Sequence, residues 1–108
     1  MVTLAGNQNF NEFELHARAL LGLNIPEIEL RYPAVSAVVL AENEGVPVYG
    51  GIALASLEPQ SDFKLFGKPT TRPYRRMGVV LTYDRLEKES MIELRARAAR
   101  IARGITVH

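Results

Sequence analysis

The sequence predicts an α+β fold: a small, mostly antiparallel or barrel-like β-sheet with one helix before it and one after it. Two segments with helical spacing of apolar residues lie near the two ends of the chain. Between them lie several short segments rich in apolar and β-branched residues, which is typical of strands. Because strands and helices do not alternate regularly, the sheet is expected to be antiparallel, and 108 residues suffice for one domain.

The first helix is predicted over Asn11–Leu21. Either Asn9 or Asn11 can cap it, because an asparagine side chain accepts a hydrogen bond from a free N–H group of the first turn. Gly22 follows the segment and suits the position after a helix, where a left-handed conformation is common. The apolar residues of this segment recur at helical spacing: Phe13, Ala17, Leu20 and Leu21.

Several segments between the helices have the character of strands. Ala34–Ala41 is almost uncharged and rich in β-branched residues, which predicts a buried strand. Phe63–Phe66 and Arg76–Thr82 are predicted as two further strands, and Val46–Tyr49 as a short one. Ile52–Leu57 fits either a short helix or a strand, because so few residues do not reveal a period.

The last helix has the clearest pattern. Asp84 followed by Glu87 resembles a capping box, in which the first side chain caps the helix and the second returns to the cap. Gly104 is expected to end the element. One apolar stripe runs along the helix and is expected to face the sheet: Met91, Leu94, Ala98 and Ile101.

The composition excludes several functional classes. The chain has no cysteine, which rules out disulfide frameworks and Cys-ligated metal sites. No apolar run is long enough to cross a bilayer, and the first residues lack the pattern of a secretory signal. Residues 1–62 carry 2 basic and 8 acidic side chains, whereas residues 63–108 carry 11 basic and 4 acidic ones. This segregation of charge leaves room for a local anion site in the second part of the chain, although it does not imply an acidic or basic partner for the whole chain.

One basic segment between the last two predicted strands suits an anion. It contains Lys68, Arg72, Arg75 and Arg76 and no acid, and Gly67 allows the backbone to approach a ligand closely. Phosphate is bound well by such a set, with arginine as a planar bidentate donor and lysine as a compact charge. On composition alone, a basic segment of this kind is more often a solvated surface hairpin that binds nothing than an anion site.

The spacing of the two adjacent arginines sets a geometric condition. In a regular strand, Arg75 and Arg76 point to opposite faces, so both reach one phosphate only at a bulge or in the loop itself. Gly78 lies just after them and indicates a bulge or a close approach of two backbones.

Other candidates are weaker. His16 follows Glu12 by one turn, which fits a surface pair better than a catalytic group. No group of His, Asp and Glu has metal-ligand spacing, so no metal site is expected. Acidic residues interrupt the basic face of the last helix, and no aromatic residues alternate with it. Nucleic-acid binding is therefore not expected either.

Two blocks carry a resemblance to a known family. Phe66-Gly67-Lys68-Pro69 and Arg75-Arg76-Met77-Gly78-Val79 resemble the C-terminal part of the formate-dependent phosphoribosylglycinamide formyltransferases, which are ATP-grasp enzymes of purine biosynthesis. Met1–Leu4, Glu12–Leu23 and Pro33–Leu40 also resemble that family, so the likeness covers nearly the whole chain.

The resemblance implies a function. In the family, ATP activates formate, and the amine of glycinamide ribonucleotide is then formylated. Carried over by position, Lys68, Arg75 and Arg76 are expected to bind the phosphate of the ribonucleotide. Residues 1–24 are expected to be the tail helix of an ATP-grasp domain, and residues 25–108 the C-terminal ribonucleotide-binding domain.

The resemblance also limits what this chain does alone. ATP and Mg²⁺ belong to the full-length enzyme, and no cofactor or catalytic residue is expected in these 108 residues. We therefore expect a cytoplasmic enzyme whose isolated C-terminal part is inactive. The apolar face of the first helix would pack on the preceding domain, so a homodimer is expected for the chain by itself.

Two alternatives stay open at this stage. The ATP-dependent aminoimidazole ribonucleotide carboxylase is a sister enzyme with a similar Arg-Pro segment, which Arg72-Pro73 resembles. Val79 stands where a histidine is expected in that relative, which favours the formyltransferase. The other alternative is a stand-alone, non-catalytic module that binds anions or takes part in assembly.

Overall fold

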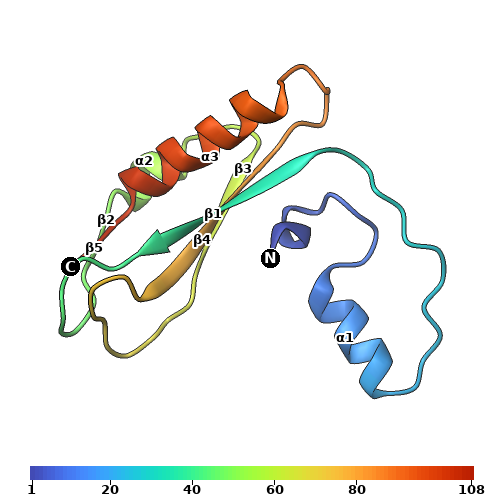
Figure 1. The fold of residues 1–108 in the computed structure, drawn as a ribbon, viewed down its shortest axis with the longest axis horizontal. Helices are drawn as coiled ribbons and strands as arrows, with labels where there is room; N and C mark the ends of the chain where they lie inside the picture. Colours follow the sequence, from blue (N-terminus) through green and yellow to red (C-terminus); the bar gives the residue numbers. More distant parts are fainter.

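The computed structural model describes residues 1–108 and has an open, three-stranded antiparallel sheet at its centre (Figure 1). The strands are β1 (Ala34–Leu40), β3 (Ser61–Leu65) and β4 (Arg76–Tyr83), in the order β1-β4-β3. Helix α3 (Met91–Gly104) lies along one face of the sheet. The α+β class with flanking helices is confirmed, but the sheet does not close into a barrel.

The remaining elements are short. Strands β2 (Tyr49–Gly50) and β5 (Thr106–Val107) pair antiparallel as a separate two-stranded sheet. Helix α2 (Ile52–Ala55) follows β2, which decides the segment that the sequence left open. Two predicted strands have other bounds in the structure. Strand β2 covers only the last residue of Val46–Tyr49, although Val48 exchanges two backbone hydrogen bonds with His108, and β3 starts two residues before Phe63. Pairing partners, which local sequence does not show, set these bounds.

Strand β4 is the central strand and is covered on both faces. Val80 faces α3, whereas Val79 and Leu81 face the short 3₁₀-helix η1 (Val2–Ala5) on the other side. Alternate residues of a strand point to opposite faces, so a run of buried apolar residues fits this position. The main core lies between α3 and the sheet and consists of Val39, Ala41, Ala55, Met77, Val80, Ile101, Ile105 and Val107.

A β-bulge interrupts the pairing of β1 with β4. Val39 pairs with Gly78 and Leu40 pairs with Arg76, so Met77 is the extra residue on β4. A Cβ atom at Gly78 would lie 2.7 Å from the carbonyl oxygen of Lys64 on β3. Both structural roles predicted for Gly78, a β-bulge and a close approach of two backbones, are therefore confirmed.

The start of α3 corrects the sequence analysis. Ser90, not Asp84, is the N-cap, and its capping box is completed by Glu93. Asp84 is fully buried instead and accepts a hydrogen bond of 2.6 Å from the backbone N–H of Glu89. Met91 is exposed because it lies in the first turn. The rest of the predicted stripe is confirmed as buried: Leu94, Ala98 and Ile101.

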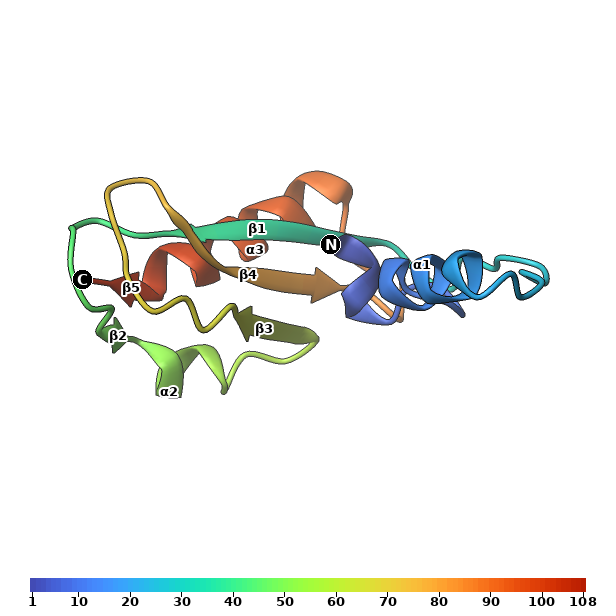
Figure 2. The ribbon, with the colours of Figure 1, turned by 90° about the horizontal axis from the view of Figure 1, so that it is seen from below.

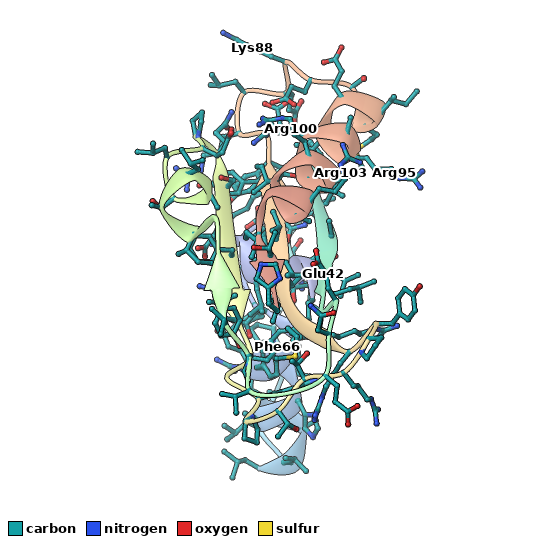
Figure 3. The ribbon with its side chains drawn as sticks, turned by 90° about the vertical axis from the view of Figure 1, so that its left-hand side faces the viewer. Glu42, Phe66, Lys88, Arg95, Arg100 and Arg103 are labelled. Atoms are coloured by element: carbon teal, nitrogen blue, oxygen red, sulfur yellow. The ribbon has the colours of Figure 1, made fainter.

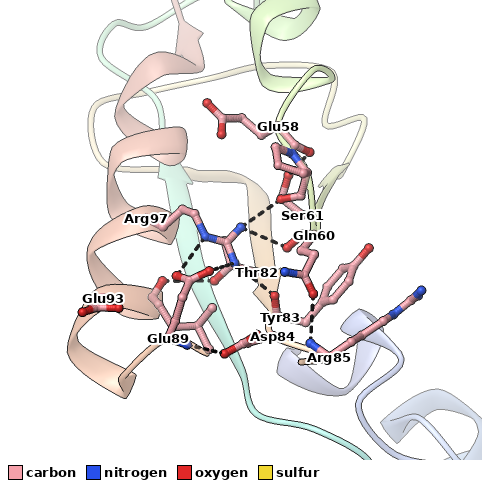
Figure 4. Close-up of polar contacts among 12 residues, drawn as sticks. Glu58, Gln60, Ser61, Thr82, Tyr83, Asp84, Arg85, Glu89, Glu93 and Arg97 are labelled. Carbon is pink, nitrogen blue, oxygen red and sulfur yellow. Dashed lines mark hydrogen bonds and ion pairs between the residues drawn. The ribbon is translucent and has the colours of Figure 1, made fainter. Parts of the chain in front are cut away.

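One arginine fastens α3 to the edge of the sheet (Figure 4). The guanidinium group of Arg97 forms an ion pair with Glu89, with N···O distances of 3.1 and 3.2 Å. It also donates hydrogen bonds to the carbonyl oxygens of Pro59, Gln60 and Tyr83 at 3.0 to 3.1 Å. A helix, a strand end and the connection before β3 are therefore held by one side chain.

The N-terminal part lies at one end of a flat molecule (Figures 1 and 2). Helix α1 (Glu12–Leu20) is capped by Asn11, which decides between the two asparagines that the sequence offered, and Gly22 after it has a φ of 67°, as expected for that position. No residue of α1 is buried, although apolar side chains recur along it. The molecule measures 43 × 37 × 20 Å, and no helix is long and apolar enough to cross a membrane.

Candidate anion-binding site

The loop between β3 and β4 is fixed by backbone hydrogen bonds along its length. Phe66 at its start donates to the carbonyl oxygen of Met77 at 2.9 Å. Thr71, in its middle, exchanges two hydrogen bonds with Gly45, at 2.7 and 3.1 Å. Beyond it, Tyr74 donates to Ala41 at 3.0 Å. The loop is therefore held against the 41–48 connection rather than free in solvent.

A tight turn spans Arg72–Arg75 within this loop. The N–H group of Arg75 donates to the carbonyl oxygen of Arg72 at 3.0 Å, which closes a four-residue β-turn. Pro73 takes the second position and Tyr74 the third, with a φ of 65°. Proline fixes φ near −65° and a positive φ follows it, so the turn is of type II, in which glycine is usual at the third position.

This turn brings the predicted residues together. A shallow concavity of about 440 Å³ is lined by Lys68, Arg72, Pro73, Tyr74, Arg75 and Arg76. The condition set by the adjacent arginines is met, because Arg75 lies in the loop and Arg76 begins β4 beside the bulge at Met77. Arg76 also lines a second hollow, of about 510 Å³, together with Phe66 and Ser36.

The basic side chains are largely free to bind a ligand. The ammonium group of Lys68 lies 5.6 Å from the centre of the Phe66 ring. Arg75 donates through Nη1 to the carbonyl oxygen and the hydroxyl of Thr70, both at 3.1 Å. None of the five ion pairs of the molecule involves a residue of this loop. The positive charge is therefore not neutralised within the chain, which favours binding of an anion.

Sequence reasoning found this loop but missed two of its features. The strained backbone of Tyr74 was not predicted, although a Pro at the second position of a turn was a signal for it. The contact with the 41–48 connection was also missed, because it joins residues far apart in the chain. The expected pair of His16 and Glu12 is absent, since Glu12 binds the N-terminal amino group of Met1 at 3.2 Å.

The basic residues of α3 lie apart from this loop, and two of them are bound to acids. On α3, Arg100 binds both carboxylate oxygens of Glu58, at 2.8 and 3.2 Å. Its hydrogen bonds lower the pKa of the Glu58 carboxyl and raise the pKa of Arg100. Figure 3 shows Arg95, Arg100 and Arg103 on α3, apart from Phe66, where the basic loop begins. No group of three or more His, Asp and Glu is arranged to hold a metal ion.

Comparison with known sequences points to one family. A family model described as "PurT, C-terminal" matches residues 34–105. Formate-dependent phosphoribosylglycinamide formyltransferases are 55% identical in Flavobacterium psychrophilum, over 100% of this chain, and 57% identical in Chlorobium phaeobacteroides, over 99% of it. The chain spans 28% of the length of each of these relatives.

Solved structures share the fold. The N5-carboxyaminoimidazole ribonucleotide synthetase of Thermotoga maritima matches 97% of this chain and 28% of its own, with a TM-score of 0.83 and 30% identity. The N5-carboxyaminoimidazole synthase of Aspergillus clavatus, solved with ADP and 5-aminoimidazole ribonucleotide, matches 92% of this chain and 27% of its own. Its TM-score is 0.69 at 20% identity, which shows likeness of fold alone.

Proposed function

Because the chain belongs to the family of C-terminal domains of formate-dependent phosphoribosylglycinamide formyltransferases, we propose that it is the ribonucleotide-binding part of such an enzyme. The whole enzyme uses ATP and formate to formylate the amine of glycinamide ribonucleotide in purine biosynthesis. The role proposed for this chain is to hold the phosphate of that ribonucleotide. Residues 1–24 would be the tail helix of the ATP-grasp domain, and residues 25–108 the ribonucleotide-binding domain.

The observation that carries this proposal is the convergence of Lys68, Arg75 and Arg76 on one concavity. A phosphate monoester presents several acceptor oxygens and up to two negative charges. Guanidinium groups match it as bidentate donors, and an ammonium group adds a compact charge. These side chains are brought together from a loop and a strand, at a site whose charge no acid of the chain neutralises.

The rest of the reaction is assigned to the rest of the enzyme. ATP, Mg²⁺ and the chemical step would belong to the remaining part of a full-length enzyme, since this chain matches only about a quarter of its relatives. In this proposal, the chain contributes binding and orientation of the ribonucleotide and no catalytic residue. By itself it is inactive as a formyltransferase, and the full-length enzyme works in the cytoplasm.

The second candidate function is that of the ATP-dependent aminoimidazole ribonucleotide carboxylase. The structure with a TM-score of 0.83 is a ribonucleotide synthetase, so the fold itself does not distinguish the two enzymes. The sequence favours the formyltransferases, because this chain is 55–57% identical to them and 30% identical to that synthetase. The names of both enzymes contain a phosphoribosyl or ribonucleotide unit, which agrees with a phosphate site in the part of the chain that they share.

An amide-shift titration by NMR tests the proposed function. Glycinamide ribonucleotide is added to the 108-residue chain and to the variants Lys68→Ala and Arg75→Ala. We expect shifts confined to residues 67–76, lost in both variants and absent with glycinamide riboside, which has no phosphate. Arg95→Ala is the control, because Arg95 is exposed on α3 and lines none of the loop. Shifts elsewhere, or none from a folded sample, would contradict the proposal.

A further inference from the structure

We propose that Arg72 is a further phosphate-binding residue, which the Arg72–Arg75 turn holds beside Arg75 and Arg76. This inference rests on the proposed function and deepens it. The resemblance assigns binding to Lys68, Arg75 and Arg76, and neither the family match nor the relatives assign a role to Arg72. The structure gives three reasons to add it: its place in the concavity, the geometry of the turn, and its lack of partners in the chain.

The first reason is position. Arg72 lines the same concavity as the three assigned residues. It occupies the first position of the turn and Arg75 the fourth, and these two positions lie within about 7 Å of each other, Cα to Cα, in a β-turn. Two guanidinium groups on side chains of this length can therefore meet on one phosphate.

The second reason is that the turn is preorganised. Thr71 is paired with Gly45 on one side of it, and Tyr74 and Arg75 are paired with Ala41 on the other, by hydrogen bonds of 2.7 to 3.1 Å. Thr71 is buried, which anchors the turn in the body of the molecule. Ordering this segment costs little on binding, because it is already ordered in the free chain.

The third reason is the supply of free donors. Arg75 has already committed its Nη1 to two oxygen atoms of Thr70. Arg72 makes no side-chain hydrogen bond or ion pair with the chain, so all five N–H donors of its guanidinium group are free. The donors of Arg72, Arg76 and Lys68 are available to a ligand, whereas Arg75 has part of its guanidinium group bound to Thr70. The site therefore has enough positive charge and enough hydrogen-bond donors to hold a phosphate dianion.

The test measures the affinity for glycinamide ribonucleotide by NMR titration of the 108-residue chain. We expect the Kd to rise about tenfold in Arg72→Ala, as loss of one charge-assisted contact implies. Arg72→Lys should recover part of the loss, because lysine keeps the charge and loses the bidentate geometry. Arg95→Ala, a charge removed from an exposed position on α3, should leave the Kd unchanged.

Folding of the variant is checked in the same spectra. Arg72 takes part in the turn through its carbonyl oxygen, which alanine keeps, so the amide signals of Ala41 and Gly45 should not move in the free Arg72→Ala chain. If wild type binds at residues 67–76 and Arg72→Ala binds equally well, the role of Arg72 is refuted and the proposed function stands. If wild type does not bind there, both are refuted.

Discussion

Tyr74 has a φ of 65° although the residue is 82% exposed, so burial of its side chain does not explain this conformation. A left-handed conformation costs a residue with a Cβ atom about 1–2 kcal/mol. The backbone hydrogen bonds on either side of the turn impose it here, by fixing the loop to Ala41 and Gly45. Strain of this kind is concentrated at binding sites, which agrees with the place of Tyr74 in the basic concavity.

Replacing Tyr74 should therefore show how much strain the turn stores. In Tyr74→Gly we expect the free energy of unfolding to rise by about 0.5–1 kcal/mol, because glycine adopts the left-handed region freely but also gains freedom in the unfolded chain. Urea unfolding followed by circular dichroism measures it. Tyr74→Ala is the control and should give no increase, since alanine keeps the Cβ atom. Equal stability of the two variants would contradict the explanation.

At the scale of elements, the attachment of α3 depends on Arg97. This side chain joins Glu89 to the carbonyl oxygens of Pro59, Gln60 and Tyr83. Arg97→Ala should lower the free energy of unfolding by about 2–3 kcal/mol, because several carbonyl oxygens and a half-buried carboxylate lose a charged donor. Chemical denaturation of both chains measures this difference.

The control for Arg97 is another arginine of the same helix. Arg95 is exposed and takes part in no ion pair, so Arg95→Ala should change stability by less than about 0.5 kcal/mol. Arg97→Lys should have nearly the stability of Arg97→Ala, since a single ammonium group cannot bind Glu89 and the three carbonyl oxygens together as the planar guanidinium group does. A loss of stability shared by Arg95→Ala would show that the net charge of α3, and not this contact, is responsible.

The sequence predicts an element well when neighbouring residues determine it, and poorly when tertiary contacts do. The helix at Glu12–Leu20 follows from a few adjacent residues and was predicted, and Asn11 was one of the two caps proposed for it. The start of α3 was not, because Asp84-x-x-Glu87 and Ser90-x-x-Glu93 match the same capping pattern. Tertiary structure decides between them: Asp84 is buried at the end of β4, and Glu87 has a φ of 53°, which no helix allows.

The same distinction between local and tertiary causes applies to the candidate site. Lys68, Arg75 and Arg76 could be proposed from residue types and the resemblance, and they do line one concavity. The bulge at Met77 depends on pairing with β1, and the fixed turn depends on the 41–48 connection. Neither partner is adjacent in the chain, so the local sequence of the loop does not show how Arg75 and Arg76 come to face the same concavity.

At the scale of the whole molecule, the chain is less compact than its length suggests. Its radius of gyration is 15.5 Å, whereas a compact domain of this length has about 13 Å. The excess comes from the N-terminal part, where α1 and the segment after it project from the sheet (Figures 1 and 2). Their exposed apolar side chains form what we call the α1 surface: Phe13, Leu20, Leu21, Leu23, Ile25, Ile28 and Leu30.

The α1 surface is expected to make the isolated chain self-associate. A contiguous apolar surface rarely stays in contact with water, and a second copy is the partner present in a pure sample. We expect light scattering to show a homodimer that dissociates on dilution. Leu20→Glu should shift it toward monomer, because Leu20 is 75% exposed at the end of α1. Leu57→Glu is the matched control, since Leu57 is 77% exposed after α2 and away from α1. A monomer at every concentration would refute the homodimer, and equal dissociation by both variants would place the interface elsewhere.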